Sequence, residues 1–210
     1  PVIFDALELR TEYLSELGKA NEAIDQLDGL LAADPPLPHT ADLLTLRGDL
    51  LFAAERFEEA GTDYQHALDL DPERVGAMIG RARVLAAMGE RQTARELHEA
   101  AAAIEADLPA HDGSAALAHA RFELAVGDSD AAKRRLRALL TLQPRHGEAA
   151  LLMAQILLDE KSAPPHSEEL MDVARRALLF EQGPEAAELR VLFPDEGPAN
   201  EAEETGQASS

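Results

Sequence analysis

The chain repeats a two-helix pattern about every 34 residues, and this repeat constrains its fold more than any other feature. The segment 41–74 shows the pattern most clearly, as two helical stretches joined by a turn at residues 55–56 and closed by a proline at position 72. One face of each stretch carries small or apolar residues: Leu44, Gly48 and Leu51 in the first, and Ala60, Tyr64, Ala67 and Leu70 in the second. A single unit cannot bury such a face alone, so the pattern predicts stacked copies.

Units with the same plan begin at Phe4, Val75 and Gly113, and small residues such as Ala82 and Ala120 allow their paired helices to approach closely. This pattern resembles the tetratricopeptide repeat, which is a 34-residue helix–turn–helix. The resemblance extends over roughly residues 4–182. It implies an all-α fold: an α-solenoid of about five tetratricopeptide-like repeats with a C-terminal capping helix.

The C-terminal part of the chain departs from the regular spacing. Residues 147–158 and 167–180 are expected to form a fifth pair of helices around a lengthened turn, and residues 184–193 are expected to cover the last apolar face. From residue 194 onward the chain carries five acids and no Lys or Arg, which predicts disorder. The predicted organisation is therefore a solenoid with its capping helix over residues 1–193, followed by an acidic disordered tail over 194–210.

Composition and missing motifs exclude several classes of function. The formal net charge is −21, and a surface this acidic repels the phosphates of nucleic acids. No apolar run approaches the roughly 18 residues of a membrane-spanning helix, so we expect no direct membrane insertion. The chain has no cysteine, and it contains no nucleophile elbow, zinc-binding helix or phosphate-binding loop. We therefore expect no enzyme activity, catalytic residue, metal or cofactor. We expect His98 to be a partly buried core residue, and His119 to be a surface or packing residue.

The beginning of the chain and its composition say little about its cellular context. The chain begins with Pro1 rather than Met, so we expect a processed product or a fragment. A cysteine-free chain suits the cytoplasm and the periplasm equally, which leaves the compartment open. The abundance of Ala, Leu, Arg and Glu is typical of a bacterial protein.

The resemblance also implies a concave groove lined by the first helices of the repeats. The residues that it places in this groove are Asp5, Glu8, Glu12, Asp49, Phe52, Ile79, Arg83, Leu117, Arg121, Leu124, Leu151, Gln155 and Leu158. We expect the groove to be acidic at its N-terminal end and apolar further on, with two arginines one repeat apart that grip carboxylates of a ligand. Two alternatives stay open: the fold buries the apolar side chains, and nearby acids pair with the arginines.

The resulting functional hypothesis is a non-enzymatic scaffold that binds a peptide or helix of a partner protein in this groove. One alternative is an accessory module of a longer enzyme or membrane-anchored assembly protein. Another is a self-assembling homo-oligomer in which a neighbouring copy fills the groove.

Overall fold

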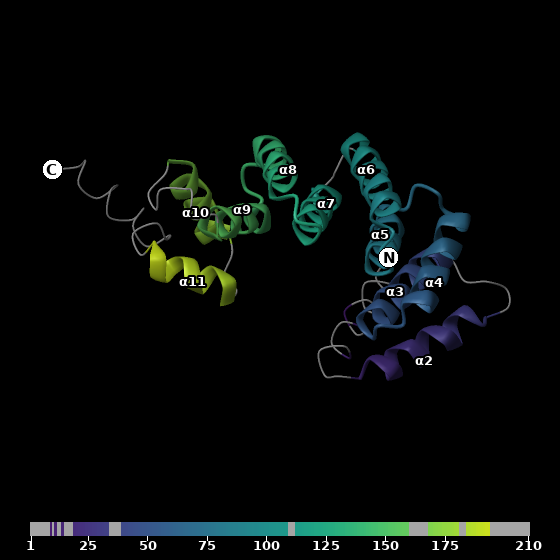
Figure 1. The fold of residues 1–210 in the computed structure, drawn as a ribbon. Helices are drawn as coiled ribbons and strands as arrows, with labels where there is room; N and C mark the ends of the chain where they lie inside the picture. The colour runs from purple at the N-terminus through teal and green to yellow at the C-terminus, as the bar shows by residue number, and fades with distance from the viewer. Residues whose placement is uncertain are drawn as a thin grey trace. The chain divides into compact units, whose positions relative to one another are not determined.

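The structure is a computed structural model, and it describes residues 9, 11, 14, 19–33, 39–108, 112–159, 168–180 and 184–193. Helices and no strands occupy these described residues (Figure 1). The helices are α2 (Ala20–Leu31), α3 (Thr40–Ala53), α4 (Phe57–Leu70), α5 (Val75–Ala87), α6 (Arg91–Asp107), α7 (Ser114–Ala125), α8 (Ser129–Leu142), α9 (Gly147–Asp159), α10 (Glu168–Phe180) and α11 (Pro184–Leu192).

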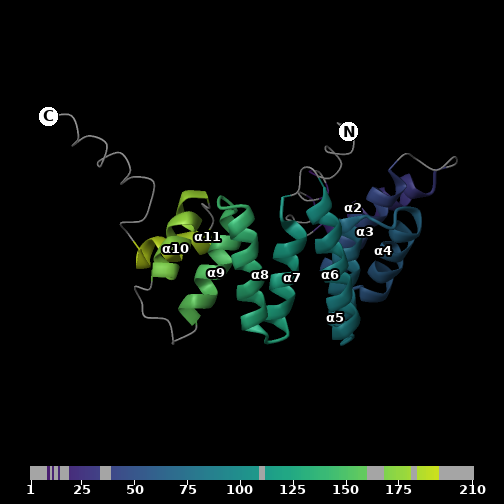
Figure 2. The ribbon, with the colours of Figure 1, turned by 90° about the horizontal axis from the view of Figure 1, so that it is seen from above.

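Successive helices pack as hairpins, and each hairpin is one repeat: α3 with α4, α5 with α6, α7 with α8, and α9 with α10 (Figure 2). The chain divides into two compact units, unit 1 over Pro1–His111 and unit 2 over Asp112–Ser210. The predicted all-α fold of helix–turn–helix repeats is therefore confirmed. The capping helix is confirmed too, because Leu189 of α11 and Phe193, which directly follows this helix, belong to the core of unit 2.

The core of unit 1 is organised around the ring of Tyr64, which is fully buried. This ring comes from α4 and lies against two glycines of the first helices, Gly48 on α3 and Gly80 on α5. A Cβ atom at Gly80 would lie 2.2 Å from Cε1 of Tyr64, and one at Gly48 would lie 2.8 Å from it. A side chain at either position would crowd the ring, so the two glycines leave the room that Tyr64 occupies.

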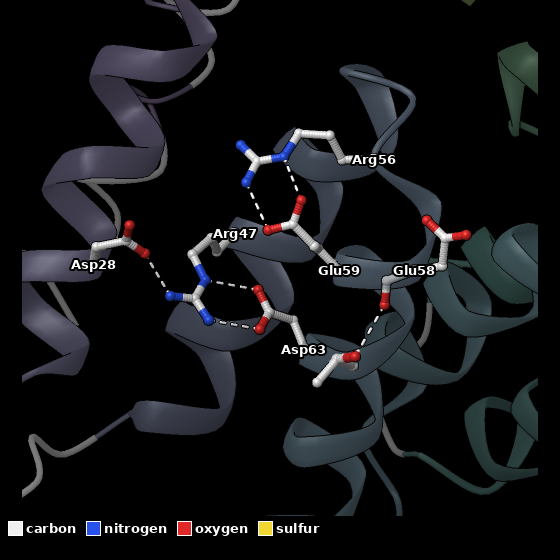
Figure 3. A network of polar contacts seen from close by, with 7 residues as sticks. Asp28, Arg47, Arg56, Glu58, Glu59 and Asp63 are labelled. Carbon is white, nitrogen blue, oxygen red and sulfur yellow. Dashed lines mark hydrogen bonds and ion pairs between the residues drawn. The ribbon is translucent and has the colours of Figure 1, made fainter.

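An ion-pair network ties the first three described helices of unit 1 together (Figure 3). The guanidinium of Arg47 on α3 donates to both carboxylate oxygens of Asp63 on α4, at 2.6 and 2.7 Å, and to Asp28 on α2 at 2.5 Å. Asp63 is buried, so its charge requires this bidentate partner. Arg56 and Glu59 form a second pair close by, on the exposed side of the network.

In the three hairpins whose turns the structure describes, one residue of the turn lies in the left-handed backbone region. Gly89 and Gly127 occupy this position in two hairpins, with φ of 88° and 86°, and Glu55 occupies it in the α3–α4 hairpin with φ of 59°. In each case the next residue donates its backbone N–H across the turn, as Arg56 does to the carbonyl of Leu51 at 2.8 Å. Glycine adopts this conformation freely, whereas glutamate adopts it at a steric cost.

Replacing Glu55 with glycine is therefore expected to raise the free energy of unfolding by about 0.5–1 kcal/mol, because it removes the cost of a left-handed non-glycine residue. Urea denaturation followed by circular dichroism measures the change. The matched variant Gly89→Ala places a side chain at the equivalent position of the next hairpin and should lower stability by about 1 kcal/mol. A loss of stability in Glu55→Gly would show that the glutamate side chain contributes more than its backbone costs.

Some sequence-based expectations concern residues outside the described part of the chain. The acidic tail over 194–210, the lengthened turn of the fifth repeat and most of the first helix of the first repeat lie there; residues 9, 11 and 14 of that helix are described and are helical. The continuous solenoid over residues 1–193 and the disorder of the tail stay predictions. Within the described residues, no helix is both long enough and apolar enough to cross a membrane.

Candidate functional site

Three of the expected groove residues meet on the first helices of unit 1. The guanidinium carbon of Arg83, on α5, lies 4.2 Å from the centre of the Phe52 ring, on α3. The Nη1 atom of the same arginine lies 3.5 Å from Oδ1 of Asp49, one turn before Phe52 on α3. The side chains of Asp49 and Arg83 are about half exposed, at 48% and 46%. Unit 1 therefore presents a carboxylate, an aromatic ring and a guanidinium together at its surface.

A buried residue of the core, Tyr64, contacts the Asp49 carboxylate. The hydroxyl of Tyr64 donates to Oδ1 of Asp49 at 2.7 Å, so the ring clamped between the two glycines reaches the surface charge. Protein atoms on the helix side desolvate the carboxylate and raise the pKa of Asp49, although the Tyr64 hydrogen bond and the Arg83 charge lower it. Burial raises the pKa of Tyr64 strongly, and the neighbouring Asp49 charge raises it further. We call Asp49, Phe52, Tyr64 and Arg83 the Arg83 cluster.

Unit 2 carries a second charged pair between first helices. Nη2 of Arg121, on α7, lies 3.6 Å from Oε2 of Glu148, on α9, and both side chains are more than half exposed. Each expected groove arginine thus has an acidic neighbour within its own unit, which was one of the alternatives left open by the sequence. Arg83 belongs to unit 1 and Arg121 to unit 2, so each arginine is described only with the neighbours in its own unit.

Two of the apolar side chains that we expected to line an exposed groove are buried instead. Leu117 and Leu151 are 4% and 8% exposed and belong to the core of unit 2. Leu124 and Leu158 are partly buried against the same core. The physical reason is that α7, α8, α9 and α10 enclose these positions, so the face of the first helices left to solvent is narrower than expected. This outcome corresponds to the alternative in which the fold buries the apolar side chains.

The other expected groove residues have mixed outcomes. Ile79 and Gln155 are partly buried, on α5 and α9 respectively. Asp5, Glu8 and Glu12 lie outside the described residues, so the acidic N-terminal end of the groove stays a prediction. No group of three or more His, Cys, Asp or Glu side chains that could hold a metal ion is found among the residues that the structure describes.

One buried polar cluster lies on α7 and α8, and the sequence did not predict it. His119 and Glu123 of α7 are 0% and 2% exposed, and His119 Nε2 lies 3.3 Å from Oε1 of Glu123. Nη2 of Arg135, from α8, lies 3.7 Å from the same carboxylate oxygen. The available signal was the position of His119 beside Ala120, on the face of α7 that packs against α8, with an acid one helical turn further on. His98 is also buried, as expected, at 1% exposure.

Comparison with known proteins agrees with this geometry. The sequence profile of the tetratricopeptide repeat family matches residues 12–75, 45–115 and 117–187, which together cover most of the chain. The chain belongs to the tetratricopeptide repeat family. Proteins of this family are generally non-enzymatic scaffolds that bind other proteins.

Individual relatives of the chain support the fold but define no specific role. Human tetratricopeptide repeat protein 13 is 35% identical over 75 residues, which are 36% of this chain; the matched region spans only 8% of that protein's length. A thermophilic tetratricopeptide repeat protein of Thermus thermophilus superimposes with a TM-score of 0.65 at 16% identity, covering 92% of this chain and 98% of that one. For pilF of Pseudomonas aeruginosa the TM-score is 0.58 at 19% identity, with 95% and 97% covered. At these identities the structural likeness shows the fold alone.

Proposed function

We propose that this tetratricopeptide repeat chain is a non-enzymatic scaffold that binds a peptide or helix of a partner protein along the first helices of its repeats. The observation that carries the proposal is the Arg83 cluster, where a charged pair and an aromatic ring meet at the surface of α3 and α5. Aromatic and arginine side chains supply much of the binding energy in protein interfaces.

The charged pairs between first helices have little structural value, which supports a role in recognition. An exposed ion pair with a separation near 3.5 Å contributes only about 0–1 kcal/mol to stability. Both the Asp49–Arg83 and the Arg121–Glu148 pairs are of this kind. These pairs therefore contribute little to the stability of the fold. Each charged side chain can leave its present neighbour and contact a partner at a small cost in free energy.

The test reverses the two arginines together in the full chain, as Arg83→Glu with Arg121→Glu. Partner capture from the native host is quantified by mass spectrometry against the wild type. Under the proposal, capture of the specific partner changes at least tenfold, because interface arginines commonly contribute more than about 1.4 kcal/mol. The helical circular-dichroism signal and the melting temperature stay close to those of the wild type, because both arginines are exposed.

A matched control separates recognition from net charge. Arg91→Glu with Arg134→Glu makes the same charge change, with one exposed arginine in each unit, but on the second helices α6 and α8. This control should keep the partner. Equal loss in both double variants would attribute binding to overall charge, and retention in both would reject the first helices as the binding surface.

Self-association is a second candidate, favoured by the apolar side chains that unit 2 leaves exposed. Phe180 on α10 and Val191 and Leu192 on α11 are large, and Val191 is 80% exposed. Such side chains at the end of a repeat array are suited to a contact with another copy. Molar mass measured by light scattering over a hundredfold range of concentration decides this candidate, since a constant monomer mass rejects it.

A further inference from the structure

The Arg83 cluster has the composition of a binding site for a guanidinium group. Asp49 and Phe52 are three residues apart on α3, so their side chains lie on one face of that helix. The guanidinium between them comes from the neighbouring helix α5, stacks on the ring and faces the carboxylate. Helix α3 therefore supplies both an aromatic face and a negative charge, which together favour a planar cation over a point charge.

The two recognition groups are positioned without help from Arg83. Tyr64 orients the Asp49 carboxylate through its hydroxyl, and the ring of Tyr64 is fixed between Gly48 and Gly80. The Phe52 ring packs against Phe57, with 5.3 Å between ring centres and 57° between ring planes. The site on α3 is thus built into the core of unit 1, and we expect it to keep its shape when the arginine leaves.

Arg83 is held weakly compared with the groups around it. Its side chain is nearly half exposed, and its separation of 3.5 Å from Asp49 is longer than a good charged hydrogen bond. An exposed ion pair and an exposed cation–π contact each change an equilibrium constant by about fivefold or less. A competing cation from a second molecule can therefore displace this side chain into solvent.

We propose that Asp49 and Phe52 form a binding site for an arginine side chain of the partner, and that Arg83 occupies this site in the free protein. This inference rests on the proposed function, because it places the site on the same first helices. The charge of unit 1 favours a cationic partner segment: residues 1–111 carry 22 acidic and 9 basic residues. Arg83 then acts as an internal competitor that a partner must displace.

The experiment uses acetyl-arginine amide as the probe, titrated into the full ¹⁵N-labelled chain and followed by amide chemical shifts. Removing the competitor in Arg83→Ala should tighten binding of the probe about three- to tenfold, with the shifts centred on α3 around residues 49–52. Arg81→Ala removes the same charge from the same helix and should leave the affinity at the wild-type value. Adding Asp49→Asn or Phe52→Leu to Arg83→Ala should abolish binding at the site.

Two further measurements test the chemistry of recognition. In the Arg83→Ala background, Tyr64→Phe should weaken probe binding while retaining the buried ring, because Asp49 loses the hydroxyl that orients it. Nα-acetyl-lysine amide, which keeps its side-chain ammonium group, should bind more weakly than the arginine probe, since an ammonium stacks poorly on an aromatic ring. Equal binding of the two probes would contradict a site specific for arginine.

Several results would overturn the proposal. Unchanged or weaker probe binding in Arg83→Ala rejects the competitor role, and an equal gain in Arg81→Ala attributes the gain to net charge. If acetyl-glutamate amide binds to the wild type but not to Arg83→Ala, this arginine binds a carboxylate of the partner. Loss of partner capture in the double arginine reversal, combined with no arginine-probe site, would retain the scaffold function and reject only this assignment.

Discussion

Replacing Glu123 with alanine is expected to lower the free energy of unfolding by about 3–5 kcal/mol, because it breaks a buried charged cluster and leaves a cavity. Glu123 is 2% exposed and lies 3.3 Å from His119 and 3.7 Å from Arg135. Without the carboxylate, the buried His119 ring and the Arg135 guanidinium lose an acidic neighbour. Urea denaturation monitored by circular dichroism measures the loss.

A matched pair of variants separates burial from charge in this prediction. Glu148→Ala removes an equally charged residue from the exposed pair with Arg121 and should change stability by less than about 1 kcal/mol. The double variant His119→Leu with Glu123→Leu replaces the pair by apolar groups and should cost less than Glu123→Ala alone. If Glu123→Ala and Glu148→Ala have equal effects, the buried cluster contributes nothing beyond an ordinary surface pair.

Gly80→Ala is expected to destabilise unit 1 by about 2–3 kcal/mol, although alanine normally stabilises a helix relative to glycine by about 1 kcal/mol. The added Cβ would lie 2.2 Å from the Tyr64 ring, and Gly48 on the opposite helix restricts the ring from moving away. Chemical denaturation gives the magnitude, and the amide spectrum of α3 reports whether the ring has shifted.

Gly29→Ala is the control for this substitution, because Gly29 lies in α2 and a Cβ added there would have no neighbouring atom within 4 Å. It should raise stability by up to about 1 kcal/mol. A second check combines Gly80→Ala with Tyr64→Leu, which removes the ring that clashes. The two substitutions should then cost less together than the sum of their separate effects. A stabilising effect of Gly80→Ala alone would contradict the close approach of the Tyr64 ring.

The repeat architecture was predictable because its signals are local. The small and apolar residues at positions 44, 48, 51, 60, 64 and 67 recur at helical spacing and are buried as expected, whereas Leu70, expected on the same face, is 60% exposed at the end of α4. The turn at residues 55–56 was also located correctly, because helices of this length need a break before they can fold back. These features depend only on which residues face inward within one hairpin.

The surface properties were harder to predict because they depend on neighbouring repeats. Leu117 and Leu151 occupy positions that the resemblance assigned to the groove, yet the packing of α7 to α10 buries them. The role of Tyr64 in orienting Asp49 also crosses between helices, through a gap that exists only because two glycines 32 residues apart face each other across the ring. The spacing of residues along the sequence does not predict such contacts between helices.

The connection from Tyr64 to Asp49 gives the molecule an intrinsic optical reporter. The chain has no tryptophan and only two tyrosines, so Tyr64 is one of only two phenol chromophores in it. The hydroxyl of that phenol contacts the carboxylate at which a ligand cation would arrive. In a Tyr13→Phe background, the remaining near-ultraviolet tyrosine signal reports on the hydrogen bond from Tyr64 to Asp49. Binding of a cation at Asp49 can then be followed with unlabelled protein.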